Sequence, residues 1–227
     1  MKLPKPHSWD LTPTEAVALQ RELADRVVTD TPVTSCKLIA GADCSYNRFS
    51  PTMYAGVVVL RADDLSVVER KGAVAQTTFP YVPGLLSFRE IPVLLKAFAK
   101  LEQTPDVVVY DGQGFAHPRR IGIASHLGLS LGVPVIGCAK TRLVGSYEEP
   151  GAEAGSSSPL VHHEELIGRV VRTKAGVKPV FVSVGHLIDI DSAVRWALAA
   201  TRRHRLPEPT RLAHLYVNQL RRGEVSP

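Results

Sequence analysis

The sequence predicts an α/β fold in which an antiparallel three-strand meander leads into a parallel β-α-β unit, with helices flanking one mixed sheet. Three β-rich segments, 37–46, 54–61 and 65–78, are separated by short connections. Connections of this length join antiparallel neighbours, because a parallel crossover needs about a dozen residues or more. Further along, the apolar segments 106–111 and 133–139 enclose a helical pattern, which is typical of parallel strands covered on both faces.

The expected helices follow in order around this sheet. The motif TPTE at 12–15 combines a capping threonine, a proline at the first helical position and the glutamate of a capping box, which predicts a helix over 12–28. An amphipathic helix is expected over 88–101, where Pro92 is tolerated near the first turns. The other expected elements are a helix at 120–131, a mobile Gly- and Ser-rich loop at 151–159, strands at 167–173 and 179–184, a helix at 191–203 and a last basic helix after the turn at 207–209.

The composition indicates one soluble domain with a large core. Of the 227 residues, 44% are hydrophobic and 22% are charged, which excludes a disordered chain. The longest apolar runs have the length of strands, far below the ~20 residues of a membrane span, and the first ten residues lack the apolar core of a secretory signal. Cys36, Cys44 and Cys138 provide neither a disulfide framework nor a metal-ligand spacing. We therefore expect a cytoplasmic, monomeric protein of one domain over 1–227, without contact to a membrane.

Basic residues are concentrated near the C-terminus. The net charge is only +5, but residues 201–222 contain six arginines and a single acidic residue, Glu208. Such a surplus attracts polyanions, and the planar fork of arginine suits phosphate. The alternative is a solvated helical face that serves solubility. The charge thus suggests a nucleic-acid partner without establishing it.

Three carboxylates are candidates for a cation site. Asp43 interrupts an apolar strand, where burial without a partner is destabilising, unless it bonds backbone amides near the strand end. Asp111 ends a buried strand at the edge where open α/β sheets bind ligands, or it simply forms an Asp-Gly turn. Glu90 lies on the first turn of its helix and is directed toward that edge, although a capping box with Ser87 would also explain it. Oxygen ligands of this kind suit Mg²⁺ or Mn²⁺.

Four basic side chains are placed to act near a phosphate. Lys140 ends a strand on the same side as Asp111 and could neutralise a phosphate, or it faces solvent. His186 follows a strand directly before a helix and could orient or activate a water, or it is merely solvated. His117 and Arg119 come close to an expected helix start, which favours further phosphate contacts.

The segment Pro80-Tyr81-Val82-Pro83-Gly84 predicts a rigid loop that presents an aromatic side chain between two prolines. Aromatic wedges inserted between bases are a known means of distorting a duplex and exposing a base. The alternative is a tyrosine packed over the rim of the core.

Together these motifs resemble one family closely. The ordered runs are AGAD at 40–43, PYVPGLLSFRE at 80–90, DGQGFAHPRR at 111–120, GVPVIGCAK at 132–140, RTK at 172–174 and VSVGH at 182–186. Over roughly 37–195 the chain is similar to endonuclease V, a nuclease that acts on deaminated purines. The resemblance implies a ribonuclease-H-like fold, in agreement with the meander and the β-α-β order.

The resemblance also implies roles for single positions. Asp43, Glu90 and Asp111 match the metal-site carboxylates of the family, and Lys140 and His186 match positions at its active centre. The expected wedge and DNA-binding residues are Pro80, Tyr81, Val82, Pro83, His117 and Arg119. A pocket for the displaced base is hypothesised at Gly112, Gly114, Gly137, Cys138 and Ala139.

The activity implied by the resemblance is a nick in DNA at the second phosphodiester bond 3′ to deoxyinosine, which leaves a 3′-hydroxyl and a 5′-phosphate and requires Mg²⁺, for which Mn²⁺ can substitute. Some relatives instead prefer inosine in RNA. Val184 departs from the family, which commonly has proline there before the Gly-His pair. The loop at 151–159 and the basic tail, 201–227, do not match, so the catalytic core is expected over 37–200.

Two other functions remain open at this point. Another ribonuclease-H-like nuclease would cut whether or not inosine is present. An inactive nucleic-acid-binding module is the second alternative, but the presence of all three carboxylates counts against it, because buried acids without a metal destabilise a fold and repel phosphate.

Overall fold

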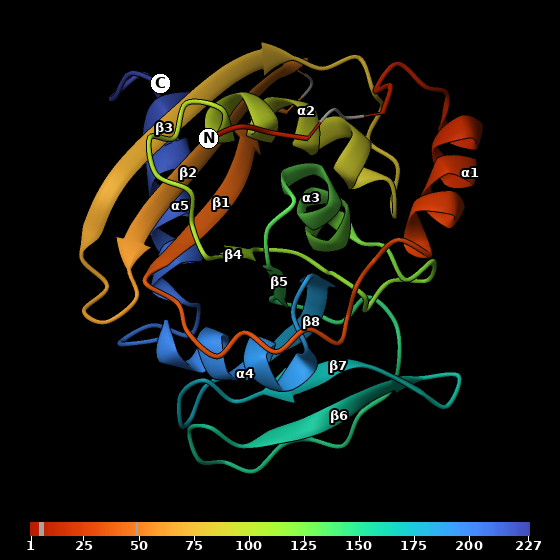
Figure 1. Cartoon of the computed structure of the whole chain (residues 1–227), viewed down its shortest axis with the longest axis vertical. Helices are drawn as coiled ribbons and strands as arrows, with labels where there is room; N and C mark the ends of the chain where they lie inside the picture. Colours follow the sequence, from red (N-terminus) through yellow and green to blue (C-terminus); the bar gives the residue numbers. More distant parts are fainter. Residues whose placement is uncertain (5–6, 49) are drawn as a thin grey trace.

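One mixed sheet forms the centre of the protein, as the sequence predicts. The computed structural model describes residues 1–4, 7–48 and 50–227. Figure 1 shows the sheet at the centre of these residues, with helices on both sides. The strands are β1 (Leu38–Tyr46), β2 (Thr52–Arg61), β3 (Val67–Gln76), β4 (Val107–Tyr110), β5 (Val135–Ala139), β6 (Ser157–His162), β7 (Glu165–Val171) and β8 (Val180–His186). The helices are α1 (Pro13–Ala24), α2 (Leu86–Phe98), α3 (Ile123–Leu131), α4 (Ile190–Ala199) and α5 (Glu208–Arg221).

The strand order, β3-β2-β1-β4-β5-β8-β7-β6, confirms both halves of the predicted topology. β1, β2 and β3 form the antiparallel meander, and β1, β4 and β5 are parallel to one another. The remaining strands return to antiparallel pairing, β5 with β8, β8 with β7 and β7 with β6. The direction of β8 therefore differs from that of β5, and this decides where its end residues lie.

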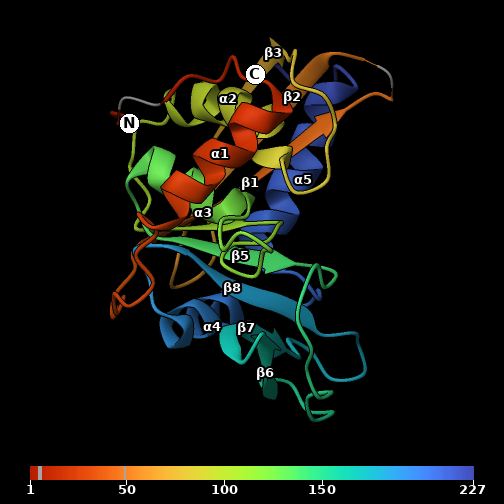
Figure 2. The ribbon, with the colours of Figure 1, turned by 90° about the vertical axis from the view of Figure 1, so that its right-hand side faces the viewer.

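Helices cover the two faces of the sheet in pairs. α2 and α3 bury apolar side chains such as Leu94 and Leu127 against one face, and α4 and α5 bury Ala197 and Ala213 against the other. Figure 2 shows α1, α2 and α3 on one side of the sheet, with α5 behind the meander strands. α1 lies outside this layer and packs Ala16 onto the start of α2. No helix in the described residues is long and apolar enough to span a membrane.

Several element boundaries differ from the predicted ones. The capping box at Thr12 and Glu15 is confirmed, but α1 ends at Ala24 instead of Val28. α2 begins two residues early, at Leu86, and no side chain caps it, which excludes the capping box with Ser87 as the alternative explanation of Glu90. Among the other differences, α3 begins at Ile123 because Arg120 has a positive φ of 57°, and α4 ends at Ala199 instead of residue 203. Ser157–Pro159 of the expected loop belong to β6.

The predicted basic tail contains a packed helix. α5 lies directly over β1 and β2, where an added Cβ at Gly41 would come within 2.0 Å of the Pro209 backbone, and one at Gly56 within 3.0 Å of Tyr216. Val217 is fully buried in the same contact. Glycines in these strands thus allow the close approach of helix and sheet. As a result, the last helix stands above the part of β1 that contains Asp43.

Candidate active site

A cavity of about 420 Å³ opens where β4 ends beside β1. The pairing of these strands stops at Ala42 opposite Tyr110, while β1 continues to Tyr46. Beyond this point the two strands no longer pair with each other, so side chains from helices on either face can meet there. Asp43, within β1, and Asp111, directly after β4, both line the cavity.

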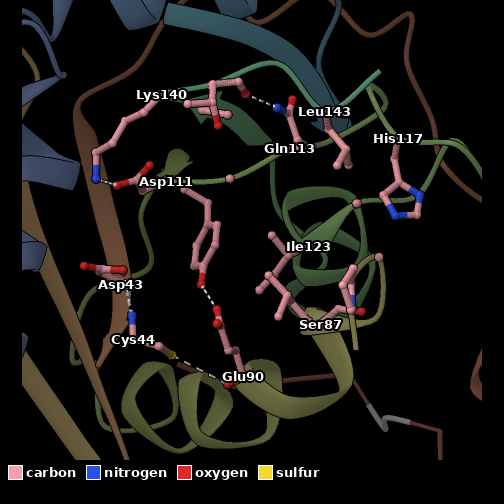
Figure 3. Close-up of a pocket in the computed structure, with 18 of the residues that line it drawn as sticks. Asp43, Cys44, Ser87, Glu90, Asp111, Gln113, His117, Ile123, Lys140 and Leu143 are labelled. Atoms are coloured by element: carbon pink, nitrogen blue, oxygen red, sulfur yellow. Dashed lines mark hydrogen bonds and ion pairs between the residues drawn. The ribbon is translucent and has the colours of Figure 1, made fainter. Parts of the chain in front are cut away.

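Glu90 reaches the cavity from α2, on the face opposite α5. Its Oε2 accepts a hydrogen bond of 2.6 Å from the Tyr110 hydroxyl (Figure 3). Burial raises the pKa of Glu90 to about 7, although the bond from Tyr110 opposes this shift; the charges of Asp43 and Asp111 raise the pKa further. Glu90 is therefore a carboxyl group whose ionisation is disfavoured, first by burial and then by the two nearby aspartates.

The two aspartates are each held by a basic side chain. Asp43 Oδ2 lies 2.8 Å from His214 Nδ1 of α5, and its Oδ1 accepts the backbone N–H of Cys44 at 2.8 Å. Lys140 forms an ion pair with Asp111 (Figure 3). Burial raises the pKa of Asp111, and Lys140 opposes the shift, whereas the hydrogen bond with Asp43 raises the pKa of His214.

The carboxylates suit a divalent cation by their chemistry. As the side chains stand, no three His, Cys, Asp or Glu residues of the described chain are close enough together to hold a metal ion. Each carboxylate instead interacts with another side chain. His214 contacts Asp43, Lys140 forms an ion pair with Asp111, and Tyr110 donates a hydrogen bond to Glu90. The acids nevertheless share one cavity, and the charge of Asp43 raises the pKa of both Glu90 and Asp111. A cation relieves that repulsion, and oxygen donors fit Mg²⁺ or Mn²⁺.

His186 lies away from this cluster, contrary to the prediction. β8 is antiparallel to β5, and His186 pairs with Val135 at the start of β5, whereas Lys140 follows the other end. The imidazole is buried, accepts the backbone N–H of Val28 at 3.1 Å and has its pKa lowered by burial. A sequence pattern shows that a strand is buried but not which way it runs, and this is why the prediction failed.

His214 is the histidine of the cavity edge that the sequence analysis missed. Its helix, α5, was expected as a basic helix of the C-terminal tail, but its docking on the sheet was not. One signal was available: Ala213, Tyr216, Val217 and Leu220 form an apolar stripe at helical spacing, which indicates a helix docked on the core. Docking brings the adjacent His214 over β1.

The other half of the cavity is mainly apolar. In Figure 3, Ile123, Ser87 and His117 lie across the cavity from Asp43 and Asp111, with Leu143 beside them. This half has the chemical character of a site for a planar ring, with apolar walls and a few polar groups.

The loop that precedes α2 forms the mouth of this half. Tyr81 and Pro83 line the cavity, and Tyr81 is 60% exposed, so it does not pack over the core rim. Arg119 holds the loop from below, because its guanidinium donates to the Gly84 carbonyl at 2.9 Å and to Gln20 Oε1 at 2.7 Å.

His117 lies under the same loop. It is buried, and its Nδ1 accepts the backbone N–H of Arg119 at 3.2 Å. Burial lowers the pKa of His117 to about 4, and the charge of Arg119 contributes. The structure thus places His117 and Arg119 as supports of the loop rather than at a helix start.

Of the five residues predicted for a base pocket, Gly112 and Ala139 line the cavity. Gly114 and Gly137 serve backbone packing: an added Cβ would lie 2.1 Å from the Val184 carbonyl oxygen at the first and 2.5 Å from the Gly114 nitrogen at the second. Cys138 is buried in the core on the α4 side. None of these three residues lines the cavity, because Gly114 and Gly137 pack against neighbouring backbone and Cys138 packs in the core.

The chain is similar to known proteins in both sequence and structure. Residues 21–215 match the family model of endonuclease V. The chain is 53% identical to an endonuclease V of Dehalococcoides mccartyi, over 97% of this chain and 99% of that protein. Among solved structures, the endonuclease V of Streptomyces avermitilis is 46% identical with a TM-score of 0.91, covering 97% of this chain and 98% of that one. An endonuclease V of Ciona intestinalis, solved in complex with a 23mer DNA containing an inosine followed by a ribo-adenosine, is 27% identical with a TM-score of 0.83, covering 95% and 100%.

Proposed function

The chain belongs to the endonuclease V family and is a nuclease, and from this premise we propose that it nicks DNA at the second phosphodiester bond 3′ to deoxyinosine, in a reaction that requires Mg²⁺ or Mn²⁺. One observation carries the proposal: the cavity combines a cluster of three carboxylates with an apolar half of the kind that holds a planar ring. A single bound strand can thus place a base in one half and a phosphate beside the other. The similar protein bound to inosine-containing DNA supports the same substrate.

Recognition of the base is argued from the start of α2. No side chain caps this helix, and Leu86 and Ser87 of its first turn line the cavity. The backbone N–H groups of a helix start are donors that seek an acceptor. Hypoxanthine offers its O6 there, whereas adenine offers an amino group that is itself a donor. Backbone amides can therefore distinguish the deaminated base from adenine.

Tyr81 is proposed as the wedge that displaces the base. The ring is exposed at the mouth of the cavity, and Pro80, Val82 and Pro83 restrict the loop that carries it. An aromatic ring held in this way can enter the stack while the base turns into the cavity.

Cleavage is assigned to the carboxylate half. Asp43, Glu90 and Asp111 would hold a divalent cation, which supplies Lewis-acid polarisation of the phosphate and a bound water of lowered pKa. Lys140 lies beside Asp111 and is placed to stabilise negative charge on the departing 3′ oxygen. His214, oriented by Asp43, takes the role that the sequence assigned to His186: it positions the attacking water and exchanges a proton with it.

The water adds to phosphorus and the bond from phosphorus to the 3′ oxygen breaks. The 3′ oxygen leaves with a proton as a hydroxyl, and the phosphate stays on the 5′ end of the downstream strand.

The basic surface beside the site supports binding of a polyanion. A second cavity, of about 760 Å³, shares Lys140, Thr141 and Arg142 with the first and is also lined by Lys178 and Arg205. Cations in such a groove attract the phosphate backbone in a salt-dependent way. The strand is therefore expected to continue past Lys140 over this surface.

The test compares two DNA duplexes that differ only in one deoxyinosine in place of deoxyadenosine. With Mg²⁺ we expect nicking of the deoxyinosine strand alone, no nicking after chelation of the metal with EDTA, and none by Asp111→Ala, the matched blank. Equal nicking of both duplexes would favour a generic nuclease. If the folded protein cut neither duplex, inosine-containing RNA would be assayed next, and failure there too would leave a binding module.

A further inference from the structure

A chain of hydrogen bonds leads from the N-terminal segment to the wall of the cavity. His7 Nδ1 lies 2.6 Å from the carbonyl oxygen of Ser8, and His7 Nε2 lies 2.7 Å from His126 Nε2. On the other side of its ring, His126 Nδ1 lies 3.0 Å from Ser87 Oγ. The chain thus contains two histidines that play no part in the proposed reaction. It ends at Ser87, a residue that lines the apolar half of the cavity (Figure 3).

The positions of the protons in this chain follow from its first member. The carbonyl of Ser8 can only accept, so His7 Nδ1 carries a hydrogen and donates it. Burial lowers the pKa of His7 and lowers that of His126 to about 3, so both rings are neutral at pH 7. A neutral imidazole has one N–H. His7 Nε2 is therefore an acceptor, His126 Nε2–H donates to it, and His126 Nδ1 accepts from the Ser87 hydroxyl.

Packing holds the His126 ring in this arrangement. The ring is fully buried, stacks on Trp9 at 5.2 Å between centroids and meets the edge of Phe88 at 5.1 Å. His7 packs against the same Trp9 at 4.2 Å. Because the site is enclosed by aromatic rings, rotation of His126 would require displacement of its neighbours.

We propose that Ser87 is a specificity-determining residue whose hydroxyl, with its proton bonded to His126, presents only acceptor lone pairs to a base in the cavity, and that His126 and His7 are its positioning residues. The inference rests on the proposed function and extends it to one edge of the base. Hypoxanthine carries a donor at N1–H next to the acceptor O6. Adenine carries the reverse pair, an acceptor at N1 next to the donor amino group.

The start of α2 therefore offers hydrogen-bond partners for both O6 and N1–H of hypoxanthine. The backbone N–H groups of Leu86 and Ser87 suit O6, and Ser87 Oγ suits N1–H. With adenine bound, its amino group, a donor, would face the backbone N–H donors, and its N1, an acceptor, would face the acceptor Ser87 Oγ. These polar groups would remain unpaired in a desolvated site. A hydroxyl that was free to rotate would lack this selectivity, because it could donate to N1 of adenine.

The first test reads the proton positions directly and needs no substrate. ¹⁵N NMR of the histidine rings in the intact protein at pH 7 distinguishes the two neutral tautomers. We expect His126 to be protonated at Nε2 and unprotonated at Nδ1. A resonance that shows His126 protonated at Nδ1 would overturn the proposal, whatever the enzyme cuts.

The second test reads the contact with the base. Ser87→Ala is expected to weaken binding of a deoxyinosine duplex about 10-fold, raising KM while kcat stays unchanged, as for loss of one hydrogen bond in a buried site. A duplex with 1-methyl-deoxyinosine, which has no N1–H, should bind Ser87→Ala and the unmodified protein equally. If Ser87→Ala weakened binding of both duplexes equally, the contact between Ser87 and N1–H would be contradicted. The activity on deoxyinosine would not be affected by that result.

The third test concerns His7 as a positioning residue. In His7→Gln the amide oxygen can still accept from His126 Nε2, so this variant should keep both the tautomer of His126 and the KM for the deoxyinosine duplex. His7→Ala removes the acceptor, and we expect mixed tautomers of His126 together with a several-fold rise in KM. The same KM and the same tautomer in both variants would show that His7 does not position Ser87.

Discussion

His117 links the stability of the protein to pH at the scale of a single residue. Its pKa is about 4 in the folded protein, well below the ~6.5 of an exposed histidine, because the ring is buried under the loop at 80–84. Below pH 6.5 the unfolded chain binds a proton that the folded protein does not bind. This residue therefore lowers the free energy of unfolding as pH falls from 6.5 to 4, by about 3 kcal/mol in total.

His117→Asn should remove that part of the pH dependence, since the asparagine oxygen still accepts the N–H of Arg119 but does not titrate. Urea unfolding between pH 7 and pH 4 measures it. The matched control is His204→Asn, at an exposed position, which should leave the slope unchanged. Identical slopes for His117→Asn and the unmodified protein would contradict the assignment.

Substitutions of His214, within α5, and of His186, at the end of β8, are expected to cause different losses of activity. His214 contacts Asp43 at the cavity, so His214→Asn should lower the single-turnover cleavage rate by about 10² or more, as for loss of an acid or base. His186→Asn should leave that rate nearly unchanged, because its amide oxygen replaces the acceptor for Val28. The opposite ranking of the two variants would restore His186 to the active centre.

At the scale of elements, the docking of α5 on β1 positions His214 beside Asp43. Gly41→Ala would bring a methyl group against the backbone at Pro209, where nothing flexible can move aside. We expect a loss of more than about 2 kcal/mol in the free energy of unfolding, with reduced nicking because His214 shifts.

Gly151→Ala is the control for this substitution. Its added methyl would meet only the Ser156 side chain, so the variant should change stability little. Chemical denaturation of the two variants decides the point: equal stability would show that the contact of α5 with β1 is less tight than the structure indicates.

The loop at 80–84 is a second element with a separable role. Tyr81 is exposed at the cavity mouth, on the loop that precedes α2. Tyr81→Ala should therefore weaken binding to the deoxyinosine duplex while leaving the affinity for Mg²⁺, measured by calorimetry, unchanged. Tyr81→Phe keeps the ring and should bind as the unmodified protein does. If Tyr81→Ala bound the lesion with full affinity, the wedge assignment would be wrong.

At the scale of the whole molecule, the sequence predicts the sheet better than the site. The meander follows from short connections, and the parallel strands follow from continuous valines, because both patterns are local. Asp43, Glu90 and Asp111 line one cavity, because β1 and β4 are neighbours in the sheet and α2 packs against one of its faces; their role as metal ligands stays a prediction.

What the sequence could not predict depends on contacts between distant segments. The direction of β8 removes His186 from the site, and the docking of α5 brings His214 into it. The roles of Gly114 and Gly137 likewise depend on a neighbouring strand or loop that packs against them. Such features require the tertiary arrangement, and of them only the docking of α5 leaves a periodic signal in the chain, its apolar stripe.

The central claim is that base site and cleavage site are two halves of one cavity, so that the position of the lesion fixes the position of the cut. Mapping the ends of the nicked strand on a duplex with one deoxyinosine, in Mg²⁺, measures this relation directly. The account predicts a single cut at the second phosphodiester bond 3′ to the lesion, with a 3′-hydroxyl and a 5′-phosphate, which moves along the duplex when the lesion is moved. A cut whose position does not follow the lesion would contradict it.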